Sequence, residues 1–145
     1  GGAAHPHTHT MAIDSSCAAT LATSAIIIWF INFIAIIKSA VPGRFKHESP
    51  PQNLEYTFDA WACIARNTSE TVPLSYVIFV AALLAGADPV SYNVLVIAFT
   101  VLRALYAVLY LNKIQPYRTL CFMFHQLCVG IVGILGLLAG YGVYL

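Results

Sequence analysis

The chain has 145 residues, of which 59% are hydrophobic and only 9% are charged. A soluble domain usually carries about a quarter charged residues, so the composition excludes an ordinary soluble protein and predicts an integral membrane protein with one compact domain. The formal net charge of +1 excludes the strongly basic surface on which nucleic-acid binding depends.

Residues 1–16 are predicted to form a flexible polar tail at the amino end. The chain starts with Gly1 rather than Met, which leaves two origins open: a targeting peptide has been removed, or a short segment precedes a native Met11. Alternating histidines in this tail could hold a metal weakly, but we favour a tail without a metal site. These histidines are His5, His7 and His9.

The first two predicted membrane helices cover about 17–37 and 54–87. The first is apolar along its length, and about 20 apolar residues are enough to cross the hydrocarbon of a bilayer. The second is polar in its first half and apolar in its second half, so we expect it to begin outside the bilayer and then enter it. Pro73 removes one backbone donor and is expected to bend this helix.

The other two predicted helices cover about 90–113 and 118–145. The connection between them contains Pro116, which disfavours helix in the residue before it. Gly136 and Gly140 form a GxxxG pair that is suited to close packing of membrane helices. The predicted fold is therefore all-α, a four-helix transmembrane bundle that forms a single domain over 17–145.

Charge distribution predicts how the helices cross the membrane. The side that carries the amino end and the second-to-third connection has only Asp14 and Asp88 as charged residues. The positive-inside rule therefore predicts both termini on the luminal side. All seven cations lie in the first-to-second and third-to-fourth connections or in the adjoining halves of the helices: Lys38, Arg44, Lys46, Arg66, Arg103, Lys113 and Arg118.

Polar residues recur on one face of the second helix and one face of the third, where charge is costly and is a functional hypothesis by default. On the second helix, Arg66 and Asn67 each fall within about 60° of Glu70 around the axis. Two faces with complementary groups should meet inside the bundle. The third helix carries a matching set, also within about 60° of one another: Arg103, Tyr106 and Tyr110.

Two interpretations of these polar residues are open. Glu70 and Arg103 could form a buried ion pair that fixes the packing, and breaking it would cost several kcal/mol. Alternatively, the residues form a pocket in which arginines bind the carboxylates of an anionic, peptide-like small molecule, Glu70 holds its ammonium group, and an amphiphilic second substrate arrives through the bilayer. Arg118, at the start of the fourth helix, could then lower the pKa of a thiol and populate the nucleophilic thiolate.

Two motifs resemble signatures of the MAPEG family, the membrane-associated proteins of eicosanoid and glutathione metabolism. The run Arg66-Asn67-Thr68-Ser69-Glu70-Thr71-Val72-Pro73 resembles the signature of the second helix of that family. The run Arg103-Ala104-Leu105-Tyr106-Ala107-Val108-Leu109-Tyr110, followed by Arg118, resembles the signature of the third helix and the arginine after it. The four spans and the chain length fit as well, so the resemblance covers nearly the whole chain.

The resemblance implies a homotrimer with glutathione sites between neighbouring subunits. Enzymatic members of the family are glutathione transferases, glutathione peroxidases, leukotriene C synthases and prostaglandin E synthases. The resemblance assigns Arg118 to stabilise the thiolate and pairs Arg103 with Glu70. It implies that glutathione is bound by Arg66, Asn67, Glu70, Tyr106 and Tyr110. Arg44 or Lys38 would reach its glycine carboxylate or the second substrate.

We therefore predict a glutathione-dependent transferase or peroxidase acting on a lipophilic electrophile or lipid hydroperoxide. The alternative is a non-catalytic, lipid-binding protein or a structural subunit of a larger membrane complex, because Cys63 stands where many enzymatic members carry an arginine. A channel or transporter is less favoured, and His125 is interpreted as a hydrogen-bonded core histidine rather than a proton relay. We expect the endoplasmic reticulum, with a mitochondrial or plastid membrane as the alternative.

Overall fold

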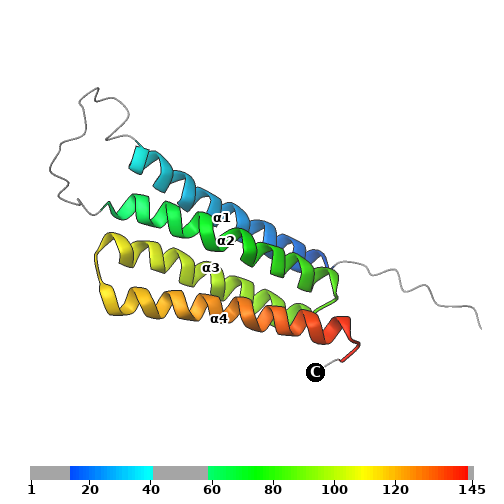
Figure 1. Ribbon diagram of the computed structural model, residues 1–145. Helices are drawn as coiled ribbons and strands as arrows, with labels where there is room; N and C mark the ends of the chain where they lie inside the picture. Colours follow the sequence, from blue (N-terminus) through cyan, green and yellow to red (C-terminus); the bar gives the residue numbers. More distant parts are fainter. Residues whose placement is uncertain (1–13, 41–58, 144–145) are drawn as a thin grey trace, which may run out of the picture.

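The computed structural model describes residues 14–40 and 59–143, and Figure 1 shows these forming four long helices in up-and-down order. All four helices are long and apolar enough to cross a membrane, and no strand is present in the described ranges. The predicted all-α, four-helix transmembrane bundle is confirmed. The helices are α1 (Ser15–Ala40), α2 (Ala60–Leu84), α3 (Pro89–Leu111) and α4 (Gln115–Gly140).

The helices are arranged so that α2 and α3 approach each other across the centre of the bundle. Helix α1 packs against both of them, and α4 packs against both from the other side. Within the described residues α1 and α4 do not touch, so they lie diagonally opposite each other. The polar faces predicted on α2 and α3 therefore belong to the two helices that meet at the centre.

Asp59 and Asp88 cap the helices that follow them. The Asp59 carboxylate accepts hydrogen bonds from the backbone N–H groups of Trp61 and Ala62, and Asp88 accepts one from Ser91 at 2.8 Å. Such bonds satisfy backbone donors that the first turn of a helix leaves free. The backbone N–H of Ser91 also holds the pKa of Asp88 below its ordinary value of 3.8, because it stabilises the charged carboxylate.

Helices α1 and α3 begin within two residues of their predicted starts, so that Ser15 and Ser16 belong to α1 and not to the predicted tail, whereas the starts of α2 and α4 differ more. Asp59 has an extended backbone, so α2 begins at Ala60 and not at residue 54; residues 54–58 lie outside the described part of the chain. Helix α4 begins at Gln115 and not at residue 118, because Pro116 lies in its first turn. A proline is tolerated there, since its missing N–H has no partner within the helix in any case.

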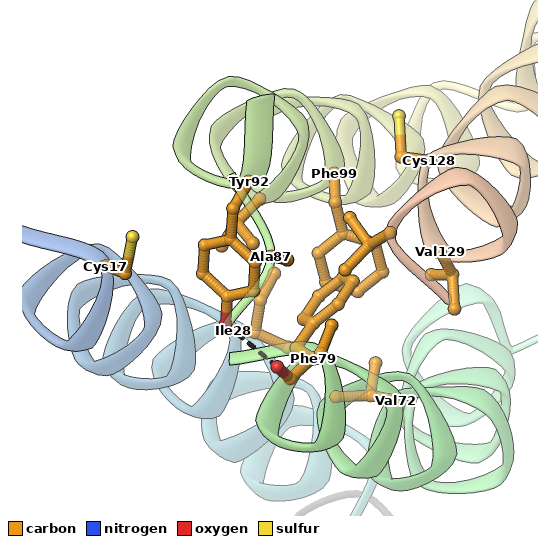
Figure 2. Packing of buried hydrophobic residues seen from close by; sticks show 12 residues of the cluster. Cys17, Ile28, Val72, Phe79, Ala87, Tyr92, Phe99, Cys128 and Val129 are labelled. Atoms are coloured by element: carbon orange, nitrogen blue, oxygen red, sulfur yellow. Dashed lines mark hydrogen bonds between the residues drawn. The ribbon is translucent and has the colours of Figure 1, made fainter. Parts of the chain in front are cut away.

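Aromatic side chains fill the centre of the bundle near the α2–α3 turn (Figure 2). The rings of Phe79 and Phe99 meet edge to face, with 5.0 Å between their centroids. The hydroxyl of Tyr92 donates a hydrogen bond to the backbone carbonyl of Phe79 at 3.1 Å. This core joins α2 to α3 with no polar atom of the Tyr92 ring left unsatisfied.

Helix α4 approaches α2 very closely at Gly136. A Cβ atom added there would lie 2.7 Å from Cα of Ala82 and 2.8 Å from its Cβ. The same test at Gly140 gives an ordinary contact, 3.9 Å from Cβ of Ala85. The close packing predicted for the glycine pair is therefore concentrated at Gly136.

Three hydroxyl groups link α1, α2 and α3. Thr100 donates to the carbonyl of Val96 at 2.8 Å, so its oxygen must accept from Ser24, which lies 2.6 Å away. The Ser24 oxygen then accepts from the hydroxyl of Tyr76 at 2.8 Å. The chain of donors runs in one direction and ends on a backbone carbonyl, so each hydroxyl is satisfied without water.

Candidate functional site

The site is built around Asn67 of α2 and two tyrosines of α3. The side-chain amide of Asn67 donates a hydrogen bond to the hydroxyl of Tyr106 at 3.0 Å. The ring of Tyr106 lies edge to face with the ring of Tyr110, with 5.5 Å between their centroids. Because the tyrosines are four residues apart, they share one face of α3, and the structure brings this face against α2.

A guanidinium group lies against each of these tyrosine rings. The Cζ atom of Arg103 is 5.0 Å from the centre of the Tyr106 ring, and that of Arg118 is 4.2 Å from the centre of the Tyr110 ring. Arg118 also donates a hydrogen bond to the side chain of Gln115 at 3.0 Å. These are cation–π distances, so two positive charges flank the tyrosine pair.

Neither of these two arginines is paired with a carboxylate of the described residues. Arg103 is 2% exposed and donates to the hydroxyl of Thr68 at 3.1 Å and towards His125 at 3.4 Å. Arginine stays charged in proteins, and a buried charge usually has a charged partner. The neighbours of Arg103 among the described residues are therefore neutral, and none of them compensates its positive charge.

The predicted ion pair between Glu70 and Arg103 is wrong for this chain. Glu70 instead pairs with Arg66 on its own helix, with 2.8 Å between Nε and Oε1. The reason is the rotation of α2: Thr68 faces Arg103, and Glu70 is two residues further on, about 200° around the helix axis. The carboxylate of Glu70 consequently points away from α3.

The Arg66–Glu70 pair lies on the outer surface of the single chain. The two side chains are 81% and 56% exposed, although α2 is apolar enough to span a membrane. This pair lies in the polar first half of α2, on the side of the helix that points away from α3.

Cys63 occupies the turn of α2 before Asn67. Cys63 packs, partly buried, against the cluster of buried residues that contains Tyr106 and Tyr110. A small side chain here lets Tyr110 pack against α2, where a long basic side chain would project into the site. The structure thus places a neutral group where a third cation would otherwise stand.

The remaining predicted site residues lie at the edge of this arrangement or outside it. Lys38 is exposed in the last turn of α1, at the end of the bundle that also carries Arg118. Arg44 lies outside the described residues. Within those residues no three His, Cys, Asp or Glu side chains come together as metal ligands, and the four cysteines are free.

Sequence patterns did not single out Thr68, and they gave His125 no functional contact. The prediction that His125 is a hydrogen-bonded core histidine is confirmed: it is 0% exposed and bonded to the carbonyl of Cys121. Thr68 lies four residues before Val72, another buried residue of α2, and this spacing is the signal that could have placed it on the inner face.

A separate groove of about 740 Å³ lies between α2 and α4 towards the α2–α3 turn. Its lining carries no charged side chain and none of the site residues described above. The groove follows the glycines of α4: Gly136 is in close contact with Ala82, whereas a Cβ atom added at Gly130 would meet nothing within 4 Å. It is therefore a feature of helix packing that is distinct from the arginine–tyrosine site.

Fold and site together define a multi-pass integral membrane protein with a cationic, tyrosine-lined site between its second and third helices. The family model described as MAPEG family matches residues 15–138. The chain therefore belongs to the MAPEG family, whose members are membrane proteins of eicosanoid and glutathione metabolism. No curated protein and no solved structure matches it significantly.

Proposed function

We propose that this protein is a glutathione-dependent transferase or peroxidase that acts on lipophilic electrophiles or lipid hydroperoxides. The observation that carries the proposal is the pair of arginines stacked on Tyr106 and Tyr110 without a carboxylate from the described residues. An uncompensated positive field of this kind attracts an anion. Glutathione carries two carboxylates and becomes more negative when its thiol ionises.

The groups in the site can contact different parts of glutathione. Arg118 is only partly buried, so its guanidinium can approach the sulfur and stabilise the thiolate. Asn67 offers an amide to the peptide backbone, and Tyr106 and Tyr110 form an aromatic wall with hydroxyl tips. Lys38 lies at the same end of the bundle.

The chemistry follows from the thiolate. In a transferase, the sulfur forms a bond to the electrophilic carbon while the leaving group departs with its electron pair. In a peroxidase, the sulfur takes the outer oxygen of the hydroperoxide, and an alcohol is released after proton uptake. A second glutathione then attacks the sulfenic acid, which gives the disulfide and water.

The exposed Arg66–Glu70 pair supports a site that neighbouring copies complete. Packing of another subunit over this part of α2 would enclose both charges and bring a bound glutathione within reach of Glu70, whose carboxylate would meet the ammonium group. A homotrimer with sites between subunits would provide such packing. Arg66 would then face the ligand from the same helix as Asn67.

A direct test is a conjugation assay with purified protein, glutathione and a chromogenic electrophile. Replacing Arg118 with alanine should lower the rate by about a hundredfold, the usual loss when one group that stabilises a developing charge is removed. Lys113→Ala is the matched control, because Lys113 is an exposed cation in the adjacent connection that lies outside the site. Wild-type protein without activity, or equal rates in both variants, would refute the proposal.

The second candidate is a non-catalytic lipid-binding protein or a structural subunit of a larger membrane complex. The position of Cys63 beside the tyrosine cluster favours it, because the site lacks the cation that many enzymatic members of the family carry at this position. Mild extraction from native membranes separates the candidates. Recovery within a stable larger assembly supports the structural subunit, whereas a free trimer that turns over glutathione excludes it.

A further inference from the structure

Arg103 has a histidine where a buried arginine usually has an acid. His125 of α4 is 0% exposed, and its Nε2 lies 3.4 Å from Nη1 of Arg103. A carboxylate at this position would neutralise Arg103 with a forked ion pair. The histidine instead gives the guanidinium a hydrogen-bond acceptor without a negative charge.

The hydrogen bonds around His125 determine its protonation state. The carbonyl of Cys121 can only accept, so Nδ1, 3.0 Å away, must carry the proton. Arg103 can only donate, so Nε2 must be the acceptor. Both contacts are satisfied together only by the neutral ring with its proton on Nδ1.

Aromatic packing holds this ring in place. Phe122 meets it edge to face with 5.0 Å between ring centres, and Phe99 lies 5.6 Å away on a tilted plane. Tyr106, the ring that Arg103 stacks on, is 6.4 Å away. The imidazole therefore connects α4 to both the arginine and the tyrosine of the site.

On the far side of Arg103, Thr68 closes the arrangement. The Thr68 hydroxyl donates to the carbonyl of Ile64 at 2.7 Å, so its oxygen is free to accept from Arg103. The guanidinium is thus held between two neutral acceptors on α2 and α4. Its orientation against Tyr106 is fixed, and its charge is retained.

We infer that His125 is a positioning residue that orients Arg103 against Tyr106 while leaving the arginine charge uncompensated for an anionic ligand. Because it rests on the proposed function, the inference concerns the same glutathione site. It predicts that two properties of residue 125 matter separately: the ability to accept a hydrogen bond and the absence of negative charge. A purely structural histidine would require only the first.

Three substitutions separate these properties. His125→Gln keeps a neutral acceptor near the position of Nε2, His125→Leu removes the acceptor, and His125→Glu supplies a charged acceptor that neutralises Arg103. We expect the glutamine variant to bind glutathione within about threefold of wild type. The leucine and glutamate variants should raise KM for glutathione about tenfold, equivalent to about 1.4 kcal/mol, with a smaller effect on kcat. Equal KM values in the glutamine and glutamate variants would overturn the inference.

Nitrogen NMR of the wild-type protein tests the arrangement without glutathione. The spectrum should show a neutral His125 with its proton on Nδ1, and Arg103→Leu should shift the Nε2 resonance. A proton on Nε2, or an Nε2 resonance that is unchanged in Arg103→Leu, would overturn the inference even if glutathione binds. Conversely, the expected spectrum without any glutathione binding would refute the proposed function and the ligand part of the inference, but not the geometry around Arg103.

Discussion

Gly136 gives the most quantitative test of the packing. A methyl group at this position would lie 2.7 Å from Cα of Ala82, so α2 and α4 must move apart or distort in Gly136→Ala. Overpacking of this kind costs about 1–3 kcal/mol. Alanine also stabilises a helix relative to glycine by about 0.5–1 kcal/mol, and this gain must be separated from the clash.

Gly130 is the matched control, because it lies on the same helix and an added Cβ there meets nothing within 4 Å. Both alanine variants share the gain in helix propensity, so the difference between them isolates the clash at Gly136. Reversible unfolding in mixed micelles should find Gly136→Ala less stable than Gly130→Ala by about 1–3 kcal/mol. Two variants of equal stability would refute the close approach of α2 and α4.

Three further outcomes are expected. Ser24→Ala removes the acceptor of the Tyr76 hydroxyl and should lower the free energy of unfolding in micelles by about 0.6–1.7 kcal/mol. The double variant Ser24→Ala with Tyr76→Phe should recover part of this loss of stability. If the losses of the two single variants simply add, the hydroxyl network is contradicted. Because Ser91 lowers the pKa of Asp88, the Asp88 cap should stabilise the fold above pH 3.8 and lose this effect as the pH falls below that value. In a plot of Tm against pH, Asp88→Asn should remove the fall in Tm that protonation of Asp88 causes. A plot that is the same in wild type and variant would contradict the role of Asp88 as a helix cap. Tyr106→Phe removes the hydroxyl that accepts from the Asn67 amide, so Asn67 loses its anchor and the affinity for glutathione, measured by calorimetry, should fall about tenfold. An unchanged affinity would contradict this role of Tyr106.

The helices were predictable because their signal is local. Four apolar runs of sufficient length specify four membrane helices wherever they pack, and the observed spans agree with the predicted ones except near their ends. The start of α4 was misjudged because Pro116 is compatible with both a turn and the first turn of a helix. Only the backbone conformation of Ile114 and its neighbours decides between them.

The partner of Arg103 was not predictable in the same way. Angular spacing shows that Glu70 and Asn67 share a side of α2, but it does not show how far that helix is rotated towards α3. A rotation that brings Thr68 to Arg103 turns Glu70 outward. The contact with His125 depends in addition on the register between α3 and α4, which long-range packing determines.

The cluster of Tyr106, Tyr110 and Arg118 was more predictable than the partner of Arg103 but less predictable than the helices. The two tyrosines share a face of α3 by spacing alone. Arg118 reaches Tyr110 because the connection between α3 and α4 is short, with only residues 112–114 between the helices. A short connection forces the two helix ends together, so Arg118 lies beside Tyr110 even though α4 begins at Gln115 and not at the predicted residue 118.

Glutathione binding to the purified wild-type protein tests the central claim most directly. At a concentration of about 100 times Kd, glutathione should stabilise the folded protein by about 2.7 kcal/mol, measured as a rise in Tm. A glutathione derivative with both carboxylates amidated should produce no rise, because the proposed site would recognise an anion through Arg103 and Arg118. No rise with glutathione, or an equal rise with the amidated derivative, would contradict a cationic site for this ligand.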